Sequence, residues 1–409
     1  TVEKVIILTD KTDFETSLEN WASYETLISE ESDQFEWPTF DEREASSLCY
    51  TSGTTGNPKG VLYSHRSTLI HTYTAAMPDA LNVSARDVVM PVVPMFHVNA
   101  WGLPYICSMV GAKLVFPGPA MDGKSLCDLA LAESVTLSAG VPTIWAGVDA
   151  YLLDNKIKLP DLNRIIIGGS ACPSSMIRSF EVNHNIEVAH AWGMTELSPL
   201  GTFNSFKAKH SELDNEAKLA FKENQGRVLF GIDMKITDEA GEDLPWDGKT
   251  FGDLLVRGPN VLTNYYKQTD PLLIEDQEQN GWFMTGDVAT INPDGYMQIT
   301  DRSKDVIKSG GEWISSIDIE NAAVSHPEII EAGVIAIPHP KWDERPLLVV
   351  VKKADSHITK EAILEFFIGK IAKWWIPDDV VFVDEIPHTA TGKILKTKLR
   401  EDFANYQAE

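Results

Sequence analysis

Short apolar runs alternate with helix-like segments through the first half of the chain. Four of these runs, at residues 88–94, 112–117, 136–140 and 164–168, each end in proline or glycine, where a strand would turn. Strands that alternate with helices are typical of a parallel sheet wrapped by helices. The pattern therefore predicts an α/β fold here.

The pattern changes in the second half of the chain. Residues 206–300 show short strands separated by glycine-containing turns, which predicts a small β subdomain. After the charged segment 301–305, a compact α+β region is expected, with a helix at 316–325, strands at 331–337 and 347–352, and a helix at 359–373. We expect a large N-terminal domain of α/β layers at 1–300, a hinge at 301–305 and a small mobile C-terminal domain at 306–409.

Composition limits the classes of partner. Apolar residues make up 43% of the chain, enough for a sizeable core, and no apolar run approaches the length needed to span a bilayer. The 60 acidic residues exceed the 35 basic ones, giving a net charge of -25, which disfavours nucleic acid and anionic lipid as partners. Four scattered cysteines without a Cys-x-x-Cys pair favour the reducing cytoplasm and argue against a zinc site.

The chain starts at Thr1 instead of methionine, and residues 3–9 have the pattern of a buried strand. We expect no signal peptide here, and we expect that an N-terminal portion of the protein precedes this sequence.

The segment 50–60, Tyr-Thr-Ser-Gly-Thr-Thr-Gly-Asn-Pro-Lys-Gly, is the most informative one. Glycines let a backbone fold tightly around an anion, Ser and Thr hydroxyls donate hydrogen bonds, and Lys59 supplies charge, so a polyphosphate is the expected ligand. A P-loop would need Ser or Thr after the lysine, whereas Gly60 and Val61 follow it. An ordinary surface loop rich in Ser, Thr and Gly is the remaining alternative.

This segment resembles the signature loop of the adenylate-forming enzymes, which include acyl-CoA synthetases, luciferases and peptide-synthetase adenylation domains. Four further segments match the family in the same order, at 191–196, 285–287, 301–305 and 391–393. The resemblance covers essentially the whole chain, without the family's first N-terminal segment. It implies ATP, Mg²⁺ and coenzyme A as cofactors and a carboxylic acid as substrate, which becomes an acyl-adenylate and then an acyl-CoA.

The resemblance also implies a nucleotide site. Glu196 would hold Mg²⁺ and Thr195 a phosphate oxygen, Trp192 would stack on adenine, and Asp287 would accept both ribose hydroxyls with Arg302 nearby. Taken alone, Trp192 could be a core aromatic and Asp287 a turn residue or helix cap. The other nucleotide-binding candidates are Thr51, Ser52, Gly53, Thr54, Thr55, Lys59, Gly169, Ser170, Ala171, Ala191, Gly193 and Met194.

Two lysines correspond to catalytic and hinge positions of the family. Lys393 would reach into the active site during adenylate formation, although a lone lysine near a chain end is usually only solvated. Lys304 aligns with the hinge about which the C-terminal domain turns before CoA reacts. Residues lining the pantetheine tunnel would be Gly310, Gly311, Glu312 and Trp313.

Residues 94–102 resemble the acid-binding element of the family. His97 would be the aromatic gate and a catalytic candidate, with a buried core histidine as the alternative. Trp101, Gly140, Gly168 and Trp192 would complete a short apolar pocket without a cation for a second carboxylate. The surrounding residues are most similar to bacterial short- to medium-chain acyl-CoA ligases, including 3-methylmercaptopropionate-CoA ligases.

The sequence leaves several alternatives open. An aryl-CoA ligase or another adenylate-forming enzyme would share these motifs, and a nucleotide-binding protein without catalysis is an alternative of a different class. A peptide-synthetase domain would need a pocket aspartate and usually a carrier domain. The expected partners are the small acid, ATP and CoA, without nucleic acid or stable membrane insertion, and the expected assembly is a homodimer in the cytoplasm.

Overall fold

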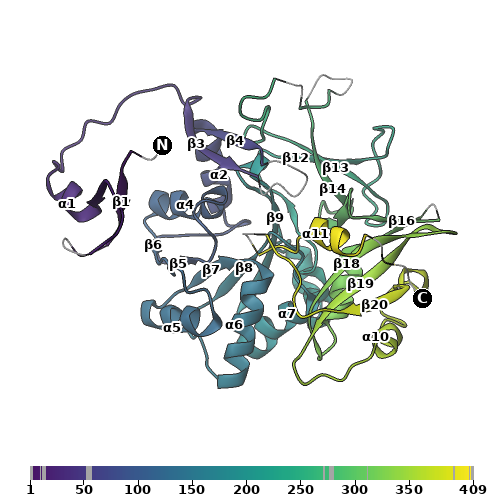
Figure 1. The fold of residues 1–409 in the computed structure, drawn as a ribbon. Coiled ribbons are helices and arrows are strands. Elements are labelled where there is room, and N and C mark those ends of the chain that lie inside the picture. The colour runs from purple at the N-terminus through teal and green to yellow at the C-terminus, as the bar shows by residue number, and fades with distance from the viewer. Residues whose placement is uncertain are drawn as a thin grey trace. The chain divides into compact units, whose positions relative to one another are not determined.

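Figure 1 shows the computed structural model of the chain. It describes residues 3–9, 11, 15–51, 58–269, 272–275, 281–310, 312–389, 392–404 and 406. These form two compact units, Thr1–Glu42 and Arg43–Glu409.

The first unit is small. Strands β1 (Val5–Ile7) and β2 (Trp21–Ser23) pair in parallel, and helix α1 (Tyr24–Ser29) follows with the Ser23 hydroxyl as its N-cap. The predicted strand near the N-terminus is present, but its predicted burial is wrong, since Ile6 is 52% and Leu8 75% exposed. A strand with one short neighbour has too little sheet around it to cover both faces.

A seven-stranded sheet forms the centre of the second unit, in the order β11-β10-β9-β8-β7-β5-β6. Strands β5 to β9 run parallel to one another, whereas β10 is antiparallel to both of its neighbours, β9 and β11. Their bounds are Val88–Pro91 for β5, Lys113–Leu114 for β6, Leu137–Gly140 for β7, Arg164–Ile167 for β8, Glu187–Gly193 for β9, Leu200–Phe203 for β10 and Arg227–Val228 for β11. The four strands predicted from apolar runs are thereby confirmed.

Both faces of this sheet are covered by helices (Figure 1). On β8, Ile165 and Ile167 pack with α5 (Gly123–Glu133) and α6 (Pro142–Asn155), while Ile166 packs with α2 (His65–Ala76) and α4 (Leu103–Val110). Successive side chains of a strand point to opposite faces, so a continuous apolar run is needed here. Smaller helices in this part are α3 (Val98–Trp101), α7 (Ser174–Arg178), α8 (Asn215–Phe221), the π-helix η1 (Ser179–His184) and the 3₁₀ helices η2 (Thr195–Leu197) and η3 (Ala208–Glu212).

Two further antiparallel arrangements adjoin this layer. The hairpin of β3 (Ala45–Tyr50) and β4 (Gly60–Ser64) lies on either side of the predicted phosphate loop. A four-stranded sheet is formed by β12 (Asp233–Thr237), β13 (Phe251–Arg257), β14 (Phe283–Ile291) and β15 (Met297–Arg302). This sheet agrees with the short strands predicted for residues 206–300.

The C-terminal region contains a third sheet with helices against it. The long strands β18 (Ile329–His339) and β19 (Asp343–Lys352) pair antiparallel along their full length, with β20 (Asp379–Phe382) parallel to β19. The remaining elements are β16 (Ile307–Ser309), β17 (Glu312–Ile314), α9 (Ser316–Val324), α10 (Lys360–Phe366), the 3₁₀ helix η4 (Lys373–Trp375) and α11 (Lys396–Asp402).

The predicted helix at 359–373 is too long. Helix α10 stops at Phe366, and Gly369 has a φ of +80°. A left-handed residue cannot continue a right-handed helix, so the chain turns there before η4. Among the described residues, no helix has the length and apolar character required to cross a membrane.

Candidate active site

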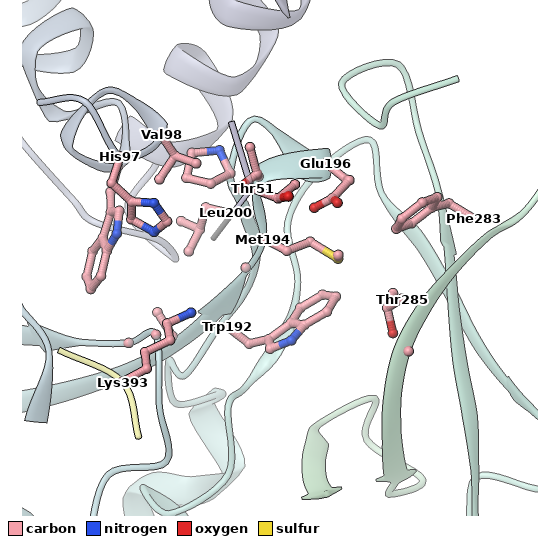
Figure 2. Close-up of a pocket in the computed structure, with 18 of the residues that line it drawn as sticks. Thr51, His97, Val98, Trp192, Met194, Glu196, Leu200, Phe283, Thr285 and Lys393 are labelled. Atoms are coloured by element: carbon pink, nitrogen blue, oxygen red, sulfur yellow. The ribbon is translucent and has the colours of Figure 1, made fainter. Parts of the chain in front are cut away.

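One cavity of about 470 Å³ lies within the second unit. Figure 2 shows that Lys393 enters it from one side, while Glu196, Phe283 and Thr285 lie on the other side. The cavity brings together the separate predicted motifs. The predicted candidates among its lining residues are Thr51, Lys59, His97, Trp101, Gly168, Gly169, Ala191, Trp192, Gly193, Met194, Thr195, Glu196, Arg302, Lys304 and Lys393.

Trp192 lies near the end of β9, and its orientation is fixed by a hydrogen bond and by close packing. The indole Nε1 donates to the Asp287 Oδ2 at 2.9 Å. A Cβ at Gly201 would lie 2.4 Å from the Trp192 ring, so only glycine fits on the neighbouring strand β10. The ring therefore has one orientation, with one surface contributing to the cavity wall.

Asp287 is a buried carboxylate with two protein partners. The Asp287 Oδ1 lies 3.3 Å from the Arg302 Nε, and the two residues are directly opposite in the β14–β15 ladder. The backbone N–H of Asp287 donates to the Thr285 hydroxyl, which itself donates to the Leu254 carbonyl. Each carboxylate oxygen has two acceptor positions, so Asp287 retains acceptor capacity. Asp287 itself is only 4% exposed, and it is its partners Trp192 and Arg302 that line the cavity.

Glu196, in the short helix η2, is positioned by a tyrosine that the sequence analysis did not identify. The Tyr265 hydroxyl donates to the Glu196 Oε1 at 2.7 Å, and the Lys59 Nζ lies 4.7 Å from the centre of the Tyr265 ring. Burial and the Glu196 carboxylate raise the pKa of Tyr265, so it remains a neutral donor. Tyr265 lies outside the five matched segments, and no sequence signal singled it out.

The chemistry of these donors fits Mg²⁺. The described residues contain no group of three or more His, Cys, Asp or Glu side chains that could hold a metal ion by themselves. Magnesium in nucleotide sites keeps water and phosphate ligands and needs only one or two protein carboxylates. The buried Glu196 carboxylate, beside Thr195 at the cavity wall, matches that requirement.

Lys393 lies in the cavity near one cation, Arg302, and two carboxylates, Asp287 and Glu196. A Cβ at Gly169 would be 3.5 Å from the Lys393 Cε, an ordinary contact distance, so the lysine side chain lies close to this glycine. Burial lowers the pKa of Lys393 to about 8, and Arg302 adds to the shift while Asp287 and Glu196 oppose it. The ammonium group is therefore still mostly protonated at neutral pH.

His97 is followed by a turn with left-handed backbone. Val98, Asn99, Ala100 and Trp101 have φ values of 45°, 52°, 49° and 57°. Left-handed backbone costs roughly 1–2 kcal/mol per non-glycine residue, so surrounding contacts have to hold this turn. Burial, with a contribution from the Lys393 charge, lowers the pKa of His97 to about 4, so its ring is neutral at physiological pH.

Several candidates lie elsewhere. Ser52, Gly53, Thr54, Thr55 and Gly311 fall outside the described residues. Gly140 lies against Trp145, whose Nε1 would be 3.0 Å from an added Cβ. Ser170 is exposed and Ala171 half-buried.

The predicted pantetheine segment lies in the C-terminal region. Gly310 and Glu312 line a second cavity of about 480 Å³, together with Trp342 and Trp374. Trp313 packs on Phe251, with 5.5 Å between the ring centres.

Comparison with known proteins agrees with this geometry. Residues 2–266 match the AMP-binding enzyme family, and residues 318–393 match the AMP-binding enzyme C-terminal domain. The chain belongs to the AMP-binding enzyme family, which confirms the resemblance to adenylate-forming enzymes.

Similar members of this family are CoA ligases. The chain is 57% identical to the 3-methylmercaptopropionyl-CoA ligase of Ruegeria lacuscaerulensis, over 93% of this chain and 70% of that protein. It is 54% identical to the medium-chain-fatty-acid–CoA ligase of Ectopseudomonas oleovorans, over 94% of this chain and 69% of that one. The ATP-bound crystal structure of MatB from Rhodopseudomonas palustris has a TM-score of 0.80 and 26% identity, covering 93% of this chain and 72% of that one.

Proposed function

We propose that this enzyme is an ATP-dependent acyl-CoA ligase that converts a carboxylic acid, ATP and CoA into acyl-CoA, AMP and pyrophosphate through an acyl-adenylate. The observation that carries the proposal is the meeting of Lys393, Glu196 and Arg302 around one cavity, with Asp287 paired to Arg302. These residues come from far-apart segments of the chain. The relatives with printed CoA-ligase names support the same reaction.

In the first half-reaction, a carboxylate oxygen attacks the α-phosphorus of ATP and pyrophosphate leaves. Two anions approach each other, so the site has to supply positive charge where negative charge accumulates. Lys393 supplies an ammonium group beside the reacting oxygens, and Arg302 supplies a second cation next to the ribose-binding Asp287. Glu196 and Thr195 would hold Mg²⁺, which neutralises phosphate charge when bound.

In the second half-reaction, the CoA sulfur forms a bond to the acyl carbon and the carbon–oxygen bond to AMP breaks. The thiol loses its proton to solvent, and AMP leaves with its phosphate charge. We assign this step to a second domain orientation, reached by rotation within residues 301–305. Gly310, Glu312 and Trp313 would then line the path of the pantetheine arm.

The proposed acid is a short- or medium-chain one, including 3-methylmercaptopropionate. Support comes from the names of the two similar relatives and from the apolar side chains that line the cavity near His97. These are Leu81, Val98, Leu103, Ile166 and Leu200. A thioether is about as apolar as a methylene chain, so one pocket accepts both kinds of acid.

The proposal includes a cytoplasmic homodimer. All four cysteines are buried and unpaired, which suits a reducing compartment. Leu69 and Tyr73 in α2, and Met77 directly after it, are 50%, 55% and 41% exposed at four-residue spacing, which supports a self-association surface. Light scattering combined with size exclusion measures the mass in solution, and a monomeric mass contradicts the dimer.

Acid-dependent release of pyrophosphate and AMP tests the function. Acids of two to twelve carbons, 3-methylmercaptopropionate, benzoate and cinnamate would each be offered with ATP and Mg²⁺, with and without CoA. We expect pyrophosphate release with short- and medium-chain acids and AMP turnover only with CoA. A preference for cinnamate would favour an aryl-CoA ligase, and ATP binding without pyrophosphate exchange for any acid would favour a non-catalytic protein.

A further inference from the structure

We propose that Asn99 is a positioning residue for the acid pocket, because its carboxamide ties the left-handed turn at residues 98–102 to strand β3. The pocket wall formed by Val98 and Trp101 then depends on a side chain that points away from the substrate. This inference rests on the proposed function for its link to the acid, while the tie itself is testable without activity.

The tie consists of two hydrogen bonds to one strand. The Asn99 Nδ2 donates to the Ser47 hydroxyl at 3.0 Å, and the Cys49 Sγ donates to the Asn99 Oδ1 at 3.6 Å. Ser47 and Cys49 are two residues apart in β3, so both side chains lie on the same face of the strand. Both ends of the Asn99 carboxamide are therefore used.

The turn needs such a tie. Left-handed φ values run through five successive residues, from Val98 to Gly102. Asparagine visits this region readily, but a β-branched valine and a tryptophan do not. At the far end, Gly102 packs against His71, whose ring would be 2.8 Å from an added Cβ. Packing fixes that end of the turn, and the Asn99 carboxamide fixes the other.

The position of the turn affects the substrate side directly. Val98 and Trp101 line the cavity, and so does Leu200, whose backbone N–H donates to the Nε2 of the same His71. If the Asn99 tie is lost, the wall at Val98 and Trp101 moves and the acid loses contacts. The nucleotide side is separate, because Asp287 and Glu196 come from other elements.

A competing explanation is that asparagine is present only because it tolerates the left-handed backbone. Two variants separate the explanations. Asn99→Gly keeps the backbone tolerance and removes the carboxamide, whereas Ser47→Ala leaves the turn residues intact and removes only the partner hydroxyl. Ser46→Ala is the matched control, since the neighbouring Ser46 hydroxyl bonds to Tyr63 and Thr68 instead.

Steady-state pyrophosphate release gives the first measurement. We expect the KM for the preferred acid to rise about tenfold in Asn99→Gly and less in Ser47→Ala, with the KM for ATP changing less than about twofold. The double variant Asn99→Gly with Ser47→Ala should resemble Asn99→Gly, because that change alone already removes the bond to Ser47. An unchanged KM for the acid in Asn99→Gly overturns the positioning role. A lower kcat and a lower melting temperature without a change in this KM overturn it as well.

Amide hydrogen exchange of the substrate-free protein gives the second measurement. Ser47→Ala should speed exchange in residues 98–102 about tenfold, and Ser46→Ala should leave these amides unchanged. Equal exchange in all three proteins overturns the tie. If the wild type shows no acid-dependent pyrophosphate release, the proposed function fails, and the exchange result still decides whether Asn99 holds the turn.

Discussion

Lys393 shows how a single residue can be adjusted by surroundings that are distant in sequence. Its ammonium group is buried beside the Arg302 cation, which disfavours its charge, and near the Asp287 and Glu196 carboxylates, which favour it. The outcome is a pKa of about 8. Lys393 is thus charged at neutral pH, but its pKa lies only about one unit above that pH.

Removing this charge should separate the two half-reactions. We predict that Lys393→Ala abolishes pyrophosphate release from ATP and acid, because the developing charge loses its cation. Conversion of preformed acyl-AMP and CoA into acyl-CoA should survive, which single-turnover assays measure. Equal loss of both steps contradicts the assigned role.

The same pKa predicts a pH dependence. Because the folded pKa of about 8 lies below the usual lysine value, the cation is lost as pH rises through about 8. We predict that kcat/KM for ATP falls about tenfold per pH unit above this point. Lys393→Arg keeps its charge, so its residual activity should stay level to about pH 9.5. No inflection from His97 is expected near neutral pH, since its pKa is about 4.

Tyr265 carries a third prediction. Tyr265→Phe keeps the ring beneath Lys59 and removes only the hydroxyl that donates to Glu196. Losing a hydrogen bond to a charged group costs about 1.5–3 kcal/mol, so Mg·ATP affinity should fall roughly ten- to hundredfold by calorimetry. Tyr266→Phe serves as the control on the adjacent residue, and matching affinities in both variants would count against the role of Tyr265.

At the scale of elements, a buried ionic cluster connects β15, α9 and α11. The Lys396 Nζ lies 2.7 Å from the Glu320 Oε1 and donates to the Ser316 hydroxyl at 2.5 Å. The Asp301 Oδ2 accepts from the backbone N–H of Ser316 at 2.6 Å. Burial raises the pKa of both Glu320 and Asp301, and the nearby Lys396 ammonium group opposes that rise.

We predict that Lys396→Ala destabilises the fold by about 3–5 kcal/mol, because it leaves the largely buried Glu320 carboxylate without its cation. Urea unfolding measures the change. The double variant Lys396→Met with Glu320→Gln removes both charges and keeps an acceptor for the Val334 N–H, so it should recover most of the loss. A double variant as unstable as Lys396→Ala would argue against charge as the cause.

Some elements could be predicted from the sequence and others could not. Continuous apolar runs predicted β5 to β8, because a strand covered on both faces cannot alternate in polarity. The left-handed turn after His97 gave no such signal, since Val98 and Trp101 oppose it locally and the contacts that hold it come from β3 and α2. The end of α10 was missed although Gly369 marks it, because the apolar pattern continues to Trp375.

In the candidate site, too, some residues were predicted from the sequence and others were not. Motif spacing brought Glu196, Arg302 and Lys393 into one hypothesis, and the cavity contains all three. Tyr265 and Asn99 were not predicted, and their side chains hydrogen-bond to other protein groups. Such residues have no spacing rule, because their partners are set by tertiary packing.

At the scale of the molecule, the proposed reaction needs two arrangements of the same chain. The chain passes from the four-stranded sheet, which ends with β15 at Arg302, to the sheet that begins at β16 through residues 303–306. The expected hinge segment 301–305 therefore starts inside β15, where Asp301 is buried. We predict that Lys304→Pro slows thioester formation far more than adenylate formation, because proline fixes φ and restricts the residue before it. Single-turnover assays of each step give the comparison, with Lys304→Ala as the control that keeps the backbone free. Equal slowing of both steps contradicts a hinge at Lys304.

The complete burial of the native thiols has a practical consequence for observing that motion. Cys49, Cys107, Cys127 and Cys172 are each at most 3% exposed, so dyes that react with sulfhydryl groups have no accessible native target. Exposed positions such as Asp154 in α6 and Glu361 in α10 can therefore be changed to cysteine in the otherwise natural chain. Fluorescence energy transfer between such a pair would follow the two arrangements in real time, one molecule at a time.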